Sequence, residues 1–190
     1  HGEIYKMNKI KQSQSRLYRT GLFSRVLISP ELQDTVGNYV PIKVFGTIGK
    51  MNELTPEILM NNQQNTFNFG LGGTYIRKNF LGSARKLTTG VSFLVQDFFK
   101  SDLSNFLKTL SLSDTTIFGL FDSKIRIEQP YMFQRPILGS FETYYQINKN
   151  SISGRKIYGG KVGLEFEMPP YTFVNYIFTY YNFEVTDEKY

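Results

Sequence analysis

The feature that most constrains this 190-residue chain is a repeated alternation of apolar and polar residues that is never broken by a long apolar run. In "TIFGLFDSKIRIEQP" (116–130), one side of an extended chain carries Phe121, Ile125 and Ile127, and the other carries Asp122, Lys124 and Arg126. A period of two indicates a β-strand with one apolar and one polar face. No apolar run reaches the roughly 18 residues that a membrane helix needs. The sequence therefore predicts a mainly β, antiparallel protein whose sheet has two unlike faces.

The same alternation continues over most of the chain after residue 50. We expect strands at 54–62, 65–78, 85–97, 116–130, 136–148, 156–168 and 171–185. Short turns are expected at 79–84, 130–135 and 168–170, and longer loops at 98–115 and 148–155, the first with a short amphipathic helix within 100–114. Long strands joined alternately by short turns and longer loops are typical of up-and-down transmembrane β-barrels. A soluble sandwich or lipocalin-like barrel is the alternative.

The N-terminal 50 residues follow a different pattern. Apolar residues at helical spacing predict a helix over 4–20, with Arg16 and Arg19 in its last turn. Gly21 fits the left-handed position after a helix end, and "FSRVLIS" (23–29) then reads as a strand that begins at Phe23. A second strand is expected at 39–47 after a turn at 37–38. Helix, strand and strand are too few for an independent domain, so we expect the end of one.

Composition excludes several kinds of chemistry. The chain has no cysteine, and its one histidine is His1, so disulfides, thiolate metal sites and Ser-His-Asp or Cys-His hydrolysis are not expected. These absences remove much hydrolytic and metal chemistry, and we expect no enzyme, no cofactor and no metal. The formal charge is +6, and most of it lies in residues 1–50. Because no base-stacking motif accompanies these charges, a solvated helical face is favoured over a nucleic-acid site.

Three other features have both a functional and a structural interpretation. Glu165 and Glu167 share one face of a strand, as an acid–base pair would, but a polar barrel lumen explains them better. "GLGG" (70–73) lacks the Lys-Ser/Thr of a phosphate loop, so it predicts a bend or a close approach of two backbones. Aromatic residues within 171–183 fit membrane anchoring better than stacking on bases or sugars.

Three motifs, in order along the chain, resemble a known family. "LYRTGLFSRVLI" (17–28) followed by "YVPIKVFGTIGK" (39–50) resembles the second helix and last two strands of a POTRA domain. "RKNFLGSARKL" (77–87) and "IRIEQPYMF" (125–133) resemble the first two periplasmic hairpins of the BamA/TamA outer-membrane assembly factors, the bacterial surface antigen family. The structural residues within these motifs are Gly21, Phe23, Gly82 and Pro130.

This resemblance implies a fold, a location and a function. Residues 1–50 would be the C-terminal part of a periplasmic POTRA domain, and residues 51–190 the first seven or so strands of a sixteen-stranded barrel in the bacterial outer membrane. We therefore expect a piece of a longer protein. Such factors fold or insert client outer-membrane proteins by adding strands at a lateral seam. Expected partners are unfolded clients, outer-membrane lipids, and accessory lipoproteins or a TamB-like protein, with no nucleic acid.

The resemblance also places the seam strand at 51–61, and the physical character of that segment suits the role. It contains a proline, several polar residues and few β-branched residues, so we expect weak pairing and an edge that accepts another chain. Its candidate client-binding residues are Met51, Asn52, Glu53, Leu54, Thr55, Pro56, Glu57, Ile58, Leu59 and Asn61. Alternative functions are a β-barrel that binds or transports an apolar ligand, and a related two-partner-secretion-type protein transporter.

Overall fold

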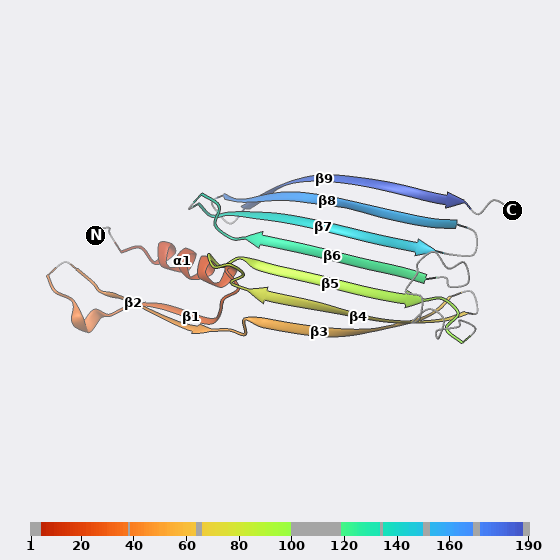
Figure 1. Ribbon diagram of the computed structural model, residues 1–190. Helices are drawn as coiled ribbons and strands as arrows, with labels where there is room; N and C mark the ends of the chain where they lie inside the picture. Colours follow the sequence, from red (N-terminus) through yellow and green to blue (C-terminus); the bar gives the residue numbers. More distant parts are fainter. Residues whose placement is uncertain are drawn as a thin grey trace.

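A computed structural model describes residues 5–37, 39–63, 66–99, 119–133, 135–149, 153–168 and 172–187. Figure 1 shows a small N-terminal module at one end of a long sheet, and the chain ends at the other end of that sheet. In the described part of the chain, no helix has the length and apolar character to cross a membrane.

The N-terminal module begins with helix α1 (Met7–Arg19), and its end explains why Gly21 is needed. The Gly21 N–H donates to the Tyr18 carbonyl at 2.9 Å while Gly21 adopts φ +69°, a left-handed conformation that favours glycine. Thr20 adds a second cap, since its hydroxyl donates to the Leu17 carbonyl at 2.6 Å. The prediction that Gly21 ends a helix and precedes a strand is confirmed.

Two antiparallel strands complete the module: β1 (Phe23–Pro30) and β2 (Ile42–Ile48), with a single 3-10 turn, η1 (Leu32–Asp34), between them. The second strand starts later than predicted because Tyr39 instead forms an isolated bridge with Val36 around Gly37. Helix α1 packs on β1, and Ile10 and Val26 are buried between them.

The remaining strands form one seven-stranded antiparallel sheet in which neighbours along the chain are neighbours in space. Its order is β3-β4-β5-β6-β7-β8-β9. The strands are β3 (Asn52–Gln63), β4 (Thr66–Lys78), β5 (Lys86–Val95), β6 (Gly119–Gln129), β7 (Ile137–Lys149), β8 (Ser153–Met168) and β9 (Thr172–Asp187). The predicted seven strands and their up-and-down order are confirmed. Among the described residues β3 and β9 do not pair with each other, so the sheet is not closed.

Two predictions about the connections have different outcomes. The long loop predicted at 148–155 is wrong: β7 and β8 stay paired as far as Lys149 and Gly154, and only residues 150–152 separate the two strands. Polar and small residues suggested a loop there, but Asn148, Lys149, Gly154 and Arg155 lie within the paired strands. The amphipathic helix predicted within 100–114 lies outside the described residues.

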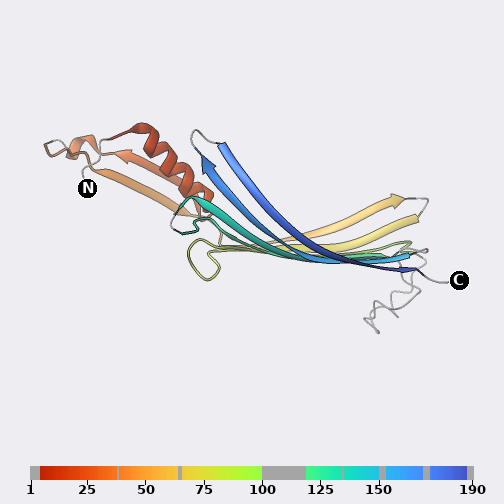
Figure 2. The same cartoon turned by 90° about the horizontal axis from the view of Figure 1, so that it is seen from above.

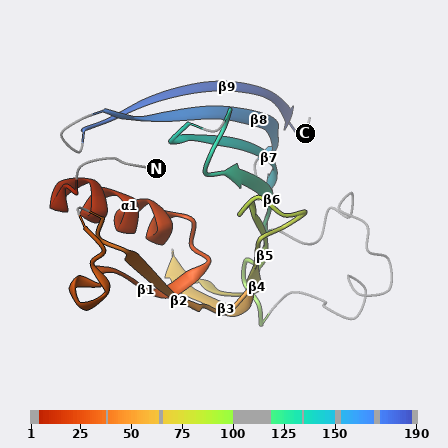
Figure 3. The same cartoon turned by 90° about the vertical axis from the view of Figure 1, so that its left-hand side faces the viewer.

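The sheet curves, and its two faces differ as the alternation predicted. Figure 3 shows α1 within the curve, between β8 and β9 on one side and β1 and β2 on the other, which makes the face that meets α1 the concave one. The strand register places charged and small residues on the concave face, including Lys86, Asp122, Lys124, Arg126, Glu128, Glu142, Lys161, Glu165 and Glu167. The convex face is apolar and exposed, with Leu54, Leu71, Val91, Ile125, Phe141, Val162 and Phe178.

Figure 2 shows the module beyond one end of the curved sheet. The β4–β5, β6–β7 and β8–β9 connections lie at that end, and the chain leaves β9 at the opposite end.

Candidate strand-docking edge

Strand β3 is the first strand of the sheet, and within the described residues only β4 pairs with it. In an antiparallel pair, alternate residues direct their N–H and C=O groups toward the partner and away from it. The Lys78 N–H donates to the Met51 carbonyl at 2.7 Å, so the odd-numbered positions face β4. The outward row is therefore Asn52, Leu54, Pro56, Ile58, Met60 and Asn62. Such a row is a template for another strand.

Pro56 is accommodated because it belongs to this outward row. A proline has no N–H, and its ring would interrupt the hydrogen bonds to β4 at an inward position. At the outward position it removes one donor from the open edge and leaves the β3–β4 pairing intact. The sequence-based prediction that Pro56 confines this segment to a sheet edge agrees with the position of β3.

The side chains of the outward row project from the convex face, and the apolar ones are among the most exposed in the protein. Leu54, Ile58 and Met60 are 73%, 65% and 62% exposed. An incoming strand would therefore find hydrogen-bonding groups together with an apolar surface beside them.

The sequence of β3 predicted weak pairing with its neighbour, and this prediction is wrong for the pairing with β4. Its pairing with β4 is continuous from Asn52 to Gln63. Polar cross-strand contacts add to it: Lys78 binds Glu53 at 2.7 Å, the Thr74 hydroxyl donates to Glu57 at 3.0 Å, the Tyr75 hydroxyl to Asn52 at 3.0 Å, and the Asn68 amide to Asn61 at 2.6 Å. Strand β3 is therefore firmly held by β4 along its whole length.

Glycines in β4, the strand next to β3, allow β4 and β5 to approach closely. A Cβ placed on Gly70 would lie 2.8 Å from the Leu94 Cα and would clash with the Phe93 carbonyl oxygen. A Cβ on Gly72 would lie 2.9 Å from the Ser92 Cβ. Both glycines face the concave side. The prediction that "GLGG" marks a close approach of two backbones is confirmed.

Farther along the sheet, the concave face carries a ladder of ion pairs across β5, β6, β7 and β8. Arg126 lies 2.9 Å from Glu128 and 3.5 Å from Glu142, and Lys161 reaches Glu142 at 3.2 Å. Lys86 pairs with Glu128. Opposite charges across neighbouring strands stabilise a sheet. This polar lattice on the concave face contrasts with the glycine-rich hairpin at the β3 end.

The edge of β1 offers a comparison, because side chains of α1 occupy it. The Val26 N–H donates to the Tyr18 hydroxyl oxygen at 3.0 Å, and the Gln14 side-chain amide donates to the Val26 carbonyl at 2.7 Å. Pro30, at another outward position of the same strand, has no N–H. This edge is therefore blocked at two positions, whereas the described residues leave the β3 edge uncovered.

The structural residues singled out from the sequence lie at turns and strand ends, away from the β3 edge. Gly82 has φ +81° in the β4–β5 turn, Pro130 follows β6, and Phe23 begins β1, while Met51 directly precedes β3. Sequence reasoning omitted Met60 and Asn62, which complete the outward row. The period of two counted from Pro56 would have included them. The described residues contain no group of three or more His, Cys, Asp or Glu side chains placed to hold a metal.

Comparison with known proteins gives a likeness to a solved structure. No protein-family model matches the sequence, and no curated protein matches it. Among solved structures, the chain is similar to a crystal structure of BamA from Haemophilus ducreyi lacking POTRA domains 1–3, with 16% sequence identity and a TM-score of 0.58. The match covers 98% of this chain and 31% of that one. At this identity the likeness shows the fold: a BamA-like partial barrel, spanning about a third of the other chain.

Proposed function

We propose that this chain is part of a non-enzymatic outer-membrane assembly factor that folds or inserts client β-barrel proteins by adding their strands to β3. The observation that carries the proposal is the uncovered β3 edge, whose outward row combines hydrogen-bonding groups with exposed apolar side chains. The BamA-like fold supports it.

The convex face supports a membrane location. Val91, Ile125, Phe141 and Phe178 come from four different strands of this face and are 51%, 45%, 51% and 72% exposed. Soluble monomers rarely expose a continuous apolar surface of this extent. Strands of 10 to 16 residues, tilted as in a barrel, are long enough to span a bilayer. In this arrangement the apolar face contacts outer-membrane lipid and the ion-pair ladder faces the lumen.

The proposed mechanism is strand addition at β3. The edge strand of an unfolded client would accept and donate hydrogen bonds along the outward row, with one donor missing at Pro56. Its apolar side chains would extend the convex face into the lipid. The contacts of β3 with β4 would hold the template in place while the client pairs.

The N-terminal module lies at the end of the sheet that carries the short turns, which is the periplasmic side in this proposal. We assign it to the last part of a POTRA domain, and place accessory lipoproteins or a TamB-like partner on the same side. A BamA-like and a TamA-like role are both consistent with the proposal.

Cysteine pairing tests the docking edge directly, because residues 1–190 contain no cysteine. Ile58→Cys on β3 should form a disulfide with a cysteine in the terminal strand of a client that is being inserted by the full-length protein. Ile125→Cys is the matched control, since it lies on the same convex face but in a strand with neighbours on both sides. Equal capture at both positions, or none at Ile58, would refute β3 docking.

Detergent dependence tests the membrane location separately. We expect the full-length protein to be insoluble or aggregated without detergent or lipid. A soluble monomeric protein in plain buffer would contradict a transmembrane sheet.

A further inference from the structure

A cluster of charged side chains joins helix α1 to the end of β8. Gln12, Arg16 and Arg19 project from the same side of α1, at the spacing that brings residues together on a helix. The Arg16 Nε lies 3.5 Å and the Arg19 Nη1 lies 3.3 Å from the Glu167 carboxylate, and the Gln12 amide donates to it at 3.4 Å. Arg19 also pairs with Glu165.

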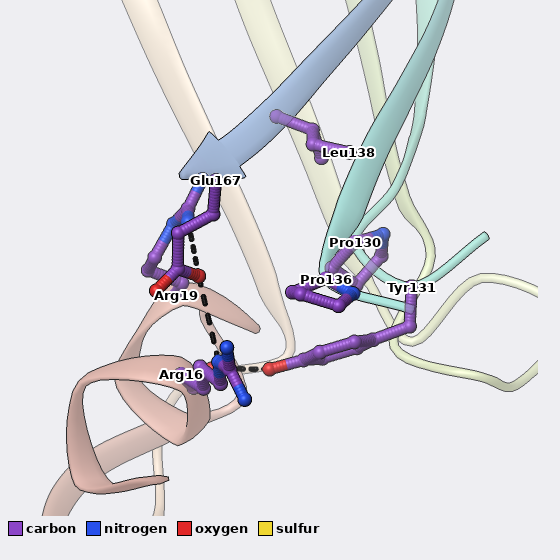
Figure 4. Close-up of a pocket in the computed structure, with 7 residues that line it drawn as sticks. All are labelled: Arg16, Arg19, Pro130, Tyr131, Pro136, Leu138 and Glu167. Carbon is purple, nitrogen blue, oxygen red and sulfur yellow. Dashed lines mark hydrogen bonds and ion pairs between the residues drawn. The ribbon is translucent and has the colours of Figure 1, made fainter. Parts of the chain in front are cut away.

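The charged side chains of this cluster are also partly buried and contact aromatic residues. The Glu167 side chain is only 8% exposed, although it carries a carboxylate. The Arg19 guanidinium lies over the Phe173 ring of β9, 4.6 Å from its centroid. In Figure 4 the Tyr131 side chain extends from the β6–β7 turn toward α1, and its hydroxyl donates to the Arg16 carbonyl at 2.9 Å. One turn of helix thus contacts three successive parts of the sheet.

Helix α1 is also joined, through β1 and β2, to β3 at the other edge of the sheet. Helix α1 packs on β1 through the Tyr18 and Gln14 contacts to Val26. The Gly49 N–H donates to the Leu22 carbonyl at 2.8 Å, which ties the end of β2 to the start of β1, just before the chain enters β3. The module therefore connects β3 to β8 by a route other than the sheet, and Figure 3 shows α1 between β8 on one side and β1 and β2 on the other.

We infer that the cluster of Gln12, Arg16, Arg19, Glu165 and Glu167 is a clamp that sets the curvature of the sheet. With the clamp closed, the module holds β3 and β8 at a fixed separation. With it open, only the β4–β7 strands connect these two ends, and the glycine-rich approach of β4 to β5 lets the β3–β4 hairpin swing outward. The clamp would thereby control where the β3 edge stands relative to the rest of the sheet.

Distance measurements between spin labels test the clamp in the full-length protein, reconstituted in phosphatidylcholine bilayers with cysteines outside residues 1–190 replaced. Labels at Lys11 on α1 and Val162 on β8 report whether the helix stays attached. Labels at Leu54 on β3 and Val162 report the separation of the two ends. The test variant is Glu165→Gln with Glu167→Gln, which keeps side-chain size and removes both negative charges.

Glu184→Gln is the matched control, because Glu184 forms an exposed pair with Lys156, 3.8 Å apart, at the far end of the β8–β9 hairpin. We expect the test variant to add a longer-distance population for both label pairs, and the control to leave both unchanged. Arg16→Gln with Arg19→Gln, which opens the clamp from the helix side, should give the same two shifts.

A variant that lengthens only the Lys11–Val162 distance would show that the cluster is a local contact and would overturn the inference. Unchanged distances in both double variants would overturn it too. If either double variant does not fold, the same two label distances are measured in the wild-type protein at 0.1 and 1 M salt. Because salt weakens ion pairs with partly exposed arginines, both distances should lengthen at 1 M salt, and unchanged distances would overturn the inference. No client takes part in these measurements, so their failure would leave the docking proposal standing.

Discussion

Gly70→Ala is the sharpest test of the close approach of β4 to β5. The new methyl group would meet main-chain atoms of β5, the Leu94 Cα at 2.8 Å and the Phe93 carbonyl oxygen. Main chain within a paired strand cannot rotate away as a long side chain can. The substitution must therefore separate the two strands locally or lose ladder hydrogen bonds.

Gly73→Ala, three residues along the same strand, is the matched control. Its Cβ would face the convex side and meet nothing closer than the Thr55 carbonyl oxygen at 3.7 Å, an ordinary contact. Overpacking a well-packed site costs about 1–3 kcal/mol. An alanine that fits gains about 0.4–1 kcal/mol from the reduced entropy of the unfolded chain. The entropy gain is common to both Gly→Ala substitutions, so we expect the two variants to differ by the overpacking cost, about 1–3 kcal/mol in the free energy of unfolding.

Urea unfolding in detergent micelles, followed by the far-ultraviolet circular dichroism of the sheet, measures this difference. The Gly70→Ala midpoint should fall below that of the wild type while the slope stays constant, and the Gly73→Ala midpoint should stay level or rise. Equal midpoints for the two variants would refute the claim that close backbone approach selects glycine at position 70.

Three further predictions concern the helix end, the clamp and the docking edge. Gly21→Ala should cost about 1–2 kcal/mol because its φ is +69°, and Gly21→Asn less, as measured by thermal unfolding. Burial raises the pKa of Tyr131 above its usual value of about 10. The protonated Tyr131 hydroxyl therefore stabilises the fold below a pH of about 10, and this contribution is lost as the pH rises through the folded-state pKa. Tyr131→Phe should remove this alkaline component and cost about 0.5–1.5 kcal/mol at neutral pH, when the Arg16 carbonyl loses its donor. Pro56→Thr restores an N–H to the outward row, so clients should dissociate from β3 more slowly in pulse-chase crosslinking, and an unchanged rate would argue against docking there.

The features that could be predicted from the sequence are those that depend on neighbouring residues. A period of two defines each strand and both of its faces, so Phe121 and Asp122 indicate opposite sides of the sheet without knowledge of the partner strands. The helix end at Gly21 depends on a few consecutive residues. Up-and-down order follows from short connections, which leave adjacent strands little alternative to pairing.

The features that could not be predicted depend on curvature. Arg16 and Glu167 are 151 positions apart, and nothing near either residue specifies the other as its partner. They meet only because the sheet bends through several strands and brings the end of β8 over α1. Tyr131 is a similar case: its motif marked a turn, but its hydroxyl reaches a helix carbonyl that only the folded geometry places there. The sequence predicted the polar face and not which of its charges would bind the module.

The edges of β1 and β3 differ in how far side chains protect them. Exposed strand edges promote unwanted association, and proteins usually protect them. This chain does so at β1, where Tyr18 and Gln14 occupy both main-chain groups of Val26 and Pro30 removes a donor. At β3 a single proline interrupts the row, and the side chains beside it are apolar rather than charged. The same polypeptide therefore has the means to close an edge and uses them sparingly at β3. In the proposed function, an accessible β3 edge is the surface that a strand-adding factor requires.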